Sequence, residues 1–317
     1  ESLALYSKEF TPYQFRQARI VEFPAYAAFA QSFANTIPFS EDIGFVQHWT
    51  DPTRIDVATY VTAHEIGHQW WGHQLVPADQ QGASMLVETF AQYSALLVME
   101  QHYGKDQVRR FLKYELDRYL LGRGTEQKQE QPLVRADGAS YVHYQKGALA
   151  LYALQDAIGE PAIDDAISAF LKRWRFTGPP YARSVDLIAE FRRVTPAALQ
   201  PLIADLFETI TLYDVRAVSA AARRQPDGSE AIELVVSARK VRADGAGNES
   251  EAPFDGEVDI GALDAKGNVV AIEKRRVHSG ENRFALAAKA GAVRAGIDPL
   301  CKLIDRDPSD NTVAVTR

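Results

Sequence analysis

Two histidines lie four residues apart in the segment His64-Glu65-Ile66-Gly67-His68, and Glu88 follows twenty residues after the second one. Side chains at positions i and i+4 of a helix lie one above the other, so both imidazoles can reach one metal ion. Catalytic zinc sites typically use three protein ligands and leave a fourth position for water. The glutamate after the first histidine accepts a proton from that water in this kind of site. The pentapeptide therefore predicts a hydrolytic zinc site with Glu65 as the base.

The alternative is a helix whose histidines have no ligand. The residues around the segment are apolar, with Val61 before it and Trp70 and Trp71 after it, which indicates a buried helix. Two histidines and a glutamate are costly to bury when no partner compensates for the lost water. The apolar surroundings therefore favour the zinc site.

The sequence offers four candidates for the third ligand: Glu88, His73, His102 and Asp79. Glu88 lies in the apolar helical stretch 84–99, where a carboxylate needs a partner such as a cation held by the preceding helix. His73 follows His68 by five residues, which is about 500° of helical rotation and places it away from the ligand face. We therefore favour Glu88, and we expect His73 to be a supporting or surface residue.

The residues around these ligands resemble the M1 (gluzincin) aminopeptidase family. Residues 64–72 read HEIGHQWWG and residues 85–93 read MLVETFAQY. The family reads H-E-x-x-H-Q-W-(F/W)-G and W-L-N-E-G-F-A-x-Y, with the second glutamate as the third zinc ligand. The resemblance covers about residues 1–210 and implies one Zn²⁺, held by the two histidines of the first motif and by Glu88.

Two further segments match the family. Residues 39–44 (FSEDIG) take the place of its G-A-M-E-N-W-G segment, which implies that Glu41 binds the α-ammonium group of the substrate. Residues 144–147 (YQKG) match Y-x-K-G, which implies that Tyr144 stabilises the transition state. Without the resemblance, Tyr144 is better explained as a packing residue, and the alternative for Glu41 is an exposed strand residue.

The chain also departs from the family pattern. The spacing from His68 to Glu88 is one residue longer than is common, and residues 77–82 replace the usual tryptophans and acidic residue. Val87 and Thr89 replace the asparagine and glycine beside the third ligand, and Phe39-Ser40 replaces a run of small residues. No ligand or base is lost, so these changes affect the substrate subsites and the preference for a free N-terminus.

Periodicity predicts an α+β fold. The resemblance implies a thermolysin-like zincin catalytic domain (1–103) that continues into a helical domain closing the cleft (104–212). Short strands separated by glycine-containing turns predict a small C-terminal β-sandwich (213–317). Near the N-terminus we expect a short helix or turn over 6–15, a strand over 19–23 and an extended segment over 36–49. The expected helices are 54–73, 84–103, 105–121, 140–158, 161–174, 184–194 and 197–209. The expected strands of the last domain are 232–236, 257–260, 269–272, 284–286 and 293–295.

Composition excludes several classes of function. The formal net charge of the 317 residues is −7, and no Lys/Arg cluster alternates with aromatic residues, so we expect no nucleic-acid partner. A single cysteine, Cys301, excludes an internal disulfide. No apolar run approaches the length of a membrane span. Because the chain begins in what reads as mid-domain sequence, we expect it to be part of a longer protein.

More specifically, the chain is similar to M1-like peptidase domains that are fused to ABC-2-type transporter permeases in bacteria. This likeness implies a permease portion as the tethered partner and a soluble domain of a bacterial membrane protein, on a side of the membrane that the sequence does not give. The similar segments are 22–24 (EFP), 32–41 (SFANTIPFSE), 81–86 (QGASML), 91–96 (AQYSAL), 296–299 (GIDP) and 303–307 (LIDRD).

These motifs together predict a zinc-dependent metallopeptidase, of aminopeptidase type, acting on peptides. One alternative is a zinc-binding but weakly active module that captures substrate for a membrane transporter or regulates it. In another, the β-domain docks a partner and the zinc site is vestigial. The intact Glu65 argues against both, because a vestigial site needs no base.

Overall fold

The computed structural model describes residues 1–46 and 54–317. Within these residues the chain forms two compact units, Glu1–Thr209 and Ile210–Arg317. This division falls three residues before the expected start of the last domain, while the division of the first unit at residue 103 stays a prediction. None of the described helices combines the length and apolarity that crossing a lipid bilayer requires.

The first unit begins with α1 (Ser2–Glu9) and two parallel strands, β1 (Arg19–Phe23) and β2 (Thr36–Ser40). The expected strand over 19–23 is confirmed. The expected extended segment over 36–49 is wrong beyond Ser40, because α2 (Glu41–Gly44) starts there, and residues 47–49 lie outside the described residues. Ser40 caps α2, since its hydroxyl oxygen accepts the backbone N–H of Asp42 at 3.3 Å.

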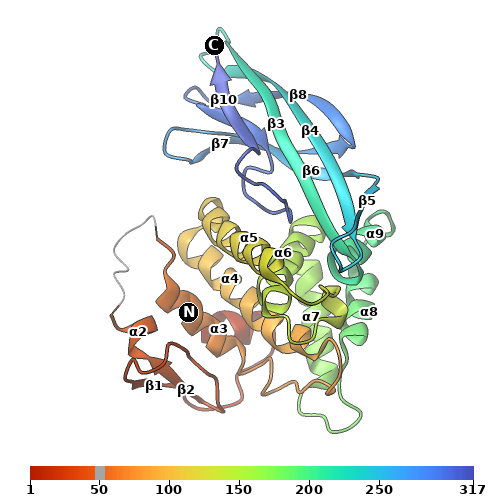
Figure 1. Cartoon of the computed structure of the whole chain (residues 1–317). Coiled ribbons are helices and arrows are strands. Elements are labelled where there is room, and N and C mark those ends of the chain that lie inside the picture. Colours follow the sequence, from red (N-terminus) through yellow and green to blue (C-terminus); the bar gives the residue numbers. More distant parts are fainter. Residues whose placement is uncertain (47–53) are drawn as a thin grey trace. The chain divides into compact units, whose positions relative to one another are not determined.

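Helices form most of the remaining first unit, and α4, α5 and α6 lie side by side in it (Figure 1). Gly67 lets α3 approach α4 closely, because a Cβ there would lie 3.2 Å from the Cα of Ala91. The expected helix 54–73 is too long, since α3 ends at Gly67 and the chain turns at Gly72, where φ is 123°. The expected helix over 184–194 is confirmed. The helices are α3 (Val57–Gly67), α4 (Phe90–Tyr103), α5 (Val108–Thr125), α6 (Gly147–Ile158), α7 (Glu160–Trp174), α8 (Ser184–Val194) and α9 (Gln200–Ile203).

Two of the expected helices, 84–103 and 140–158, start with a π-helical turn. These turns are η1 (Met85–Thr89) before α4 and η4 (Tyr141–Lys146) before α6. A π-helical turn is rare and is frequently found at functional sites. η1 contains Glu88 and η4 contains Tyr144, so both turns contain a predicted site residue.

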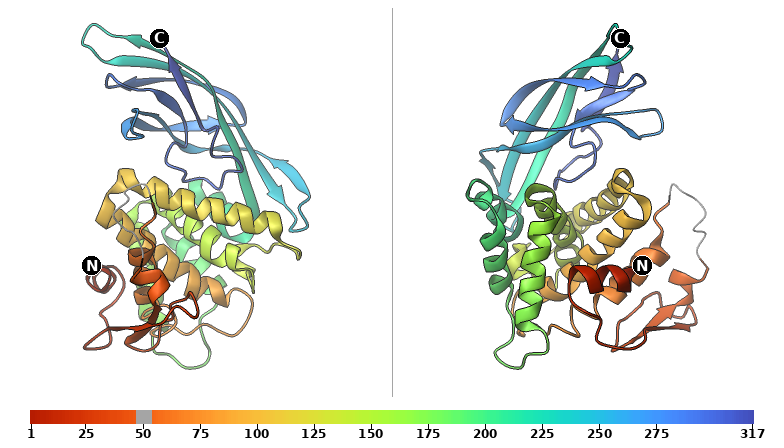
Figure 2. Two further views of the ribbon diagram at one scale, coloured as in Figure 1. Left: turned by 60° about the vertical axis from the view of Figure 1, so that its left-hand side comes forward. Right: turned by 180° about the vertical axis from the view of Figure 1, so that it is seen from behind.

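The second unit consists of strands, whose hydrogen-bonded order is β5-β4-β3-β10-β9-β6-β7, with β8 also paired to β4. Figure 2 shows β3 and β4 as a long twisted pair. Four expected strands lie within β4, β6, β7 and β8, and the fifth, 293–295, overlaps β9, but the sequence did not predict β3, β5 or β10. The strands are β3 (Ile210–Arg224), β4 (Glu230–Ala243), β5 (Glu249–Ala252), β6 (Asp255–Leu263), β7 (Val269–His278), β8 (Gly280–Ala288), β9 (Arg294–Ile297) and β10 (Thr312–Thr316).

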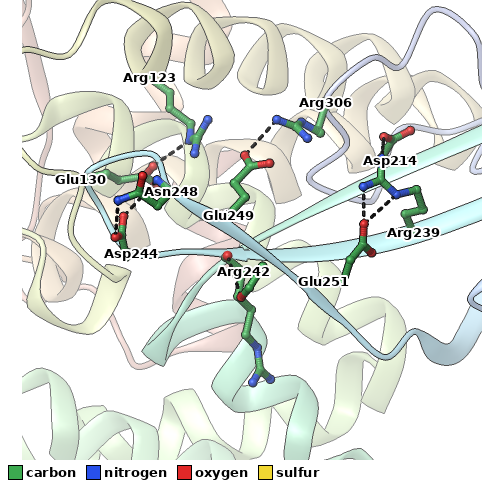
Figure 3. Close-up of polar contacts among 11 residues, drawn as sticks. Arg123, Glu130, Asp214, Arg239, Arg242, Asp244, Asn248, Glu249, Glu251 and Arg306 are labelled. Carbon is green, nitrogen blue, oxygen red and sulfur yellow. Dashed lines mark hydrogen bonds and ion pairs between the residues drawn. The ribbon is translucent and has the colours of Figure 1, made fainter.

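The expected β-sandwich is corrected in one respect: the two groups of strands are joined rather than separate. β10 pairs in parallel with β3 and antiparallel with β9, so one hydrogen-bonded path runs through both groups. Apolar side chains from both groups share one core, among them Leu234 on β4, Ile260 on β6 and Ile297 on β9. On the surface of this unit Arg239 pairs with Asp214 across β3 and β4 and with Glu251 of β5 (Figure 3).

Candidate zinc site

Helix α3 presents the two histidines and the glutamate of the H-E-x-x-H segment from its last turn. His64 and Glu65 are buried, and His68 caps the end of the helix. The Nδ1 atom of His68 lies 2.9 Å from the carbonyl oxygen of Trp71, so Nδ1–H donates there and Nε2 keeps its lone pair. The turn that ends α3 therefore orients one imidazole for a ligand.

Three atoms from two helical segments converge beside α3. The Nε2 atoms of His64 and His68 are 3.0 Å apart, and Oε2 of Glu88 lies 3.5 Å from the first and 3.3 Å from the second. Zinc bond lengths of about 2.0–2.1 Å place neighbouring ligand atoms of a tetrahedral site about 3.3–3.4 Å apart. Oε2 of Glu88 is buried and makes no hydrogen bond to the described part of the chain. The donor set and its spacing therefore fit a zinc ion.

Other candidates for the third ligand lie elsewhere. His73 faces the carbonyl oxygen of Ser32 at 3.4 Å, His102 pairs with Glu1 at 2.9 Å, and Asp79 is exposed. Within the ranges 1–46 and 54–317, the other group that could hold a metal is Glu9, Glu160 and Asp164, which has no nitrogen or sulfur donor.

Thr89 connects the two π-helical turns of the site. It is buried, and its hydroxyl donates a hydrogen bond to the carbonyl oxygen of His143 in η4. Glu88 precedes Thr89 in η1, and Tyr144 follows His143 in η4. This hydrogen bond is therefore one of the contacts that fix the relative position of Glu88 and Tyr144.

A buried ion pair fixes the end of η4 that follows Tyr144. The Nζ atom of Lys146 is fully buried and donates to Oε1 of Glu130 at 3.1 Å, and the hydroxyl of Tyr119 donates to the same oxygen at 2.7 Å. Arg123 pairs with the other oxygen of Glu130 at 2.9 Å (Figure 3). The lysine of the Y-Q-K-G segment thus positions its tyrosine through packing and charge.

Tyr144 lies against the metal-ligand cluster. Its ring stacks on that of His64, with centroids 5.6 Å apart and planes at 30°. Burial and then the neighbouring Glu88 carboxylate raise the pKa of Tyr144 well above its ordinary value, so its hydroxyl stays protonated. Tyr144 can therefore donate a hydrogen bond into the site at neutral pH.

The pKa values of the two carboxylates of the cluster, Glu65 and Glu88, shift in opposite directions. Burial raises the pKa of Glu65, and the charges of His64 and His68 only partly offset this. Burial also opposes ionisation of Glu88, but its contacts with the same two histidines outweigh burial and hold the pKa of Glu88 well below its ordinary value. Glu88 is therefore suited to stay ionised as a ligand, and Glu65 to exchange a proton.

A cavity of about 350 Å³ opens beside these residues. His64, Glu65 and Tyr144 line it, so the structure brings together the predicted base, a predicted ligand and the predicted tyrosine in one place. Sequence reasoning missed the other polar side chains of its wall, which are Tyr60, Gln92, Tyr114, Arg118, Ser140 and Gln145. Tyr60, Gln92 and Gln145 lie on segments that carry motifs, but no role was assigned to these positions, whereas Tyr114 and Arg118 come from α5, which no motif marked.

Glu41 is near this cavity but does not line it. Its Oε1 atom accepts the backbone N–H of Ala25 at 2.9 Å, and Ile43, two residues later in α2, lines the wall. Phe39, one of the departures from the family pattern, is buried and contacts Gly44 rather than the cavity. The structure therefore leaves the role of Glu41 a prediction.

Comparison with known proteins identifies the family. The family model described as the peptidase family M1 domain matches residues 1–204. The chain belongs to peptidase family M1. This membership confirms the predictions of an M1-type metallopeptidase and of one zinc ion at the level of the family.

Individual relatives are distant and longer. The putative aminopeptidase-2 of Caenorhabditis elegans is 28% identical over 138 residues, which are 43% of this chain and 7% of that protein. The aminopeptidase A of Legionella pneumophila, solved in complex with aspartic acid, is 19% identical with a TM-score of 0.54, over 90% of this chain and 31% of that one. An M1 zinc metallopeptidase mutant of Deinococcus radiodurans, bound to a Tyr-Ser-Ala substrate, is 23% identical with a TM-score of 0.49, over 65% and 42%. The chain thus spans less than half the length of these relatives.

Proposed function

We propose that this chain hydrolyses peptide bonds as a zinc-dependent metallopeptidase, with His64, His68 and Glu88 as the ligands. The observation that carries the proposal is the convergence of three ligand atoms within 3.5 Å of one another, beside a buried glutamate. When bound there, zinc supplies a Lewis acid that polarises a carbonyl and lowers the pKa of a water molecule.

Glu65 is the group that moves the proton. Burial raises its pKa, so it accepts a proton from water more readily than an exposed glutamate. The same carboxyl group then delivers this proton to the departing amine. Both transfers happen within the cavity that Glu65 lines.

Tyr144 is the hydrogen-bond donor for the substrate carbonyl oxygen, where negative charge develops during attack. A preorganised donor that lies in a partly buried site stabilises such charge strongly. Its position is fixed by the stack on His64 and by the buried Lys146–Glu130 pair two residues further along the chain. The ring of Tyr144 is therefore held beside the ligand His64 before substrate binds.

The aminopeptidase character rests on Glu41. A carboxylate is the natural partner of the substrate α-ammonium group, and this contact would place the first peptide bond at the metal. Helix α2, which contains Glu41, packs against α3, and Oε2 of Glu41 makes no hydrogen bond to the described residues. Two of the relatives compared with this chain are named as aminopeptidases, which supports the same direction.

Zinc content and the Glu65→Gln variant test the mechanism. The purified chain should contain about one zinc per molecule, and His64→Ala, His68→Ala and Glu88→Ala should each lose it. Glu65→Gln should keep the zinc and lose most peptide hydrolysis, since an amide cannot accept the proton. Glu22→Gln, on exposed β1, is the control that removes one carboxylate elsewhere. Turnover close to wild type in Glu65→Gln would exclude the mechanism, and full metal retention in Glu88→Ala would exclude Glu88 as a ligand.

A matched pair of peptides tests the exopeptidase part. Wild type should cleave the peptide with a free N-terminus much faster than its acetylated form, and Glu41→Ala should lose this difference. Asp42→Ala, which removes the same charge from the next residue of α2, should keep it. Equal cleavage of both peptides by wild type would mean that the enzyme is an endopeptidase.

The permease partner is a separate proposal. It rests on the similar segments 22–24, 32–41, 81–86 and 91–96, and it makes this chain the peptidase domain of a bacterial membrane protein. Sequencing the complete gene, followed by fractionation of cells that produce its product, tests it. A gene product without membrane spans that stays in the supernatant contradicts it.

A further inference from the structure

Arg118 is the one lysine or arginine among the residues that line the cavity beside the zinc site. It lies on α5, whereas Glu65 and His64 come from α3 and Tyr144 from η4. No sequence motif includes Arg118. The cavity wall therefore combines the proposed chemistry with a single permanent positive charge from another helix.

The guanidinium of Arg118 is oriented but largely unused. Its Nη1 atom donates to the hydroxyl of Tyr114 at 3.2 Å, and its Cζ atom lies 5.2 Å from the centre of the same ring. Among the described residues it forms no ion pair, whereas Arg123 on the same helix pairs with Glu130. An arginine has five N–H donors in a planar fork, so most of those of Arg118 remain available.

Glu115, one turn before Arg118 on α5, forms no ion pair with it among the described residues. Glu115 is fully buried and its Oε1 atom accepts hydrogen bonds from the hydroxyl of Tyr60 at 2.8 Å and from Nε2 of Gln92 at 2.9 Å. These contacts hold Glu115 within the core of the first unit, while Arg118 is exposed to solvent at the cavity. The positive charge thus faces the space that a substrate would fill.

We propose that Arg118 binds a carboxylate of the peptide substrate and makes the enzyme prefer substrates that carry one close to the cleaved bond. This proposal rests on the proposed peptidase function. A guanidinium recognises a carboxylate through two parallel, charge-assisted hydrogen bonds. The stack on Tyr114 holds the fork in place before binding, so less side-chain entropy is lost. A volume of about 350 Å³ lies in the range of ligand pockets.

Two groups of a peptide carry this chemistry: the C-terminal carboxylate of a short peptide and the side chain of Asp or Glu. Three peptides of the same length separate these two groups. The neutral reference peptide has Asn after the cleaved bond and an amidated C-terminus. Comparing it with the same peptide carrying a free C-terminus tests the terminal carboxylate, and comparing it with the amidated peptide that has Asp in place of Asn tests the side chain.

The variants are Arg118→Gln and, as the control, Lys113→Gln. Lys113 lies on the same helix, pairs with Asp117 at 2.6 Å and does not line the cavity. A hydrogen bond to a charged group makes a difference of about tenfold or more. Wild type and Lys113→Gln should therefore show a kcat/KM at least about tenfold higher for one carboxylate peptide than for its neutral partner. Arg118→Gln should bring this ratio close to one and leave the neutral peptide within about twofold of wild type.

Binding measured without turnover separates this proposal from the proposed function. Zinc-loaded Glu65→Gln and the double variant Glu65→Gln/Arg118→Gln are titrated calorimetrically with the same three peptides. Weaker binding of a carboxylate peptide alone in the double variant supports the role of Arg118, even if the wild type hydrolyses nothing. The proposal is overturned if Arg118→Gln weakens kinetics and binding equally for all three peptides, or weakens neither for any of them.

Discussion

Gly147, which ends the Y-Q-K-G segment, should not tolerate even a methyl group. Its backbone is ordinary helix, with φ −59° and ψ −48°, so glycine is not required there by conformation. Space is the constraint: a Cβ at this position would lie 2.3 Å from Oγ1, 2.6 Å from Cγ2 and 2.9 Å from Cβ of Thr89. Thr89 cannot turn away without losing its hydrogen bond to the carbonyl oxygen of His143.

The size of the effect follows from two opposing terms. Overpacking of a close-packed interior lowers the free energy of unfolding by about 1–3 kcal/mol. Replacing glycine by alanine inside a helix raises it by up to about 1 kcal/mol. Gly147→Ala should therefore destabilise the first unit by about 1–2 kcal/mol. Thr89→Ala alone should cost about 1 kcal/mol through the lost hydrogen bond. In the double variant only the 2.9 Å contact with Cβ of residue 89 remains, so Gly147→Ala should cost clearly less there than in the wild type.

Urea unfolding followed by tryptophan fluorescence measures this cycle. All four tryptophans precede residue 210, so the signal reports on the first unit. Gly124→Ala is the matched control, because it is also helical and no atom lies within 4 Å of its added Cβ. It should leave stability unchanged or raise it by a few tenths of a kcal/mol. A Gly147→Ala variant as stable as wild type, or equally unstable with and without Thr89→Ala, would refute the steric explanation.

Three further predictions concern the site and the second unit. Tyr144→Phe should lower kcat more than it raises KM in steady-state kinetics, because the hydroxyl acts mainly in the transition state, and a pure KM effect would contradict this. Chelation of zinc should lower the unfolding midpoint of the first unit, and His64→Ala, which cannot hold the ion, should show no such shift. Burial raises the pKa of Asp298 to about 7, above its unfolded value near 3.9, so the folded second unit binds this proton more tightly. This group therefore stabilises the folded unit fully below about pH 4, and the stabilisation is lost as pH rises through 7. In unfolding curves followed by circular dichroism, Asp298→Asn should reduce the fall in the free energy of unfolding between these pH values.

The sequence predicted those parts of the site that depend on local spacing. His64 and His68 meet because positions i and i+4 share a helix face, and this needs no tertiary information. The placement of Tyr144 beside them depends on packing between segments far apart in the chain, so only the family resemblance indicated it. Arg118 shows the limit of both approaches: its position on the cavity wall comes from how α5 packs, and no motif or periodicity contains that information.

The fold shows the same division. Strand β3 was missed because no glycine or proline separates it from the last helical turn of the first unit. Without such a turn-forming residue, the sequence does not indicate where the helix ends and the strand begins. The extended segment after β2 was wrong because Ser40 caps a short helix, a local signal that the apolar pattern obscured. The joining of two groups of strands through β10 depends on hydrogen bonds between distant segments, which alternation does not reveal.

The two π-helical turns explain why the departures from the family pattern can leave the site intact. A π-turn adds a residue to the helical ladder, which rotates the residues before the turn by about 100° relative to the residues after it. Glu88 can thus face the histidines while Phe90, two residues later, stays in the core. The family has glycine where this chain has Thr89, and here the threonine side chain fills the space that Gly147 leaves and binds the carbonyl oxygen of His143. Threonine in place of glycine at position 89 therefore links η1, which contains the ligand Glu88, to η4, which contains Tyr144. The same threonine leaves no space for a side chain at position 147.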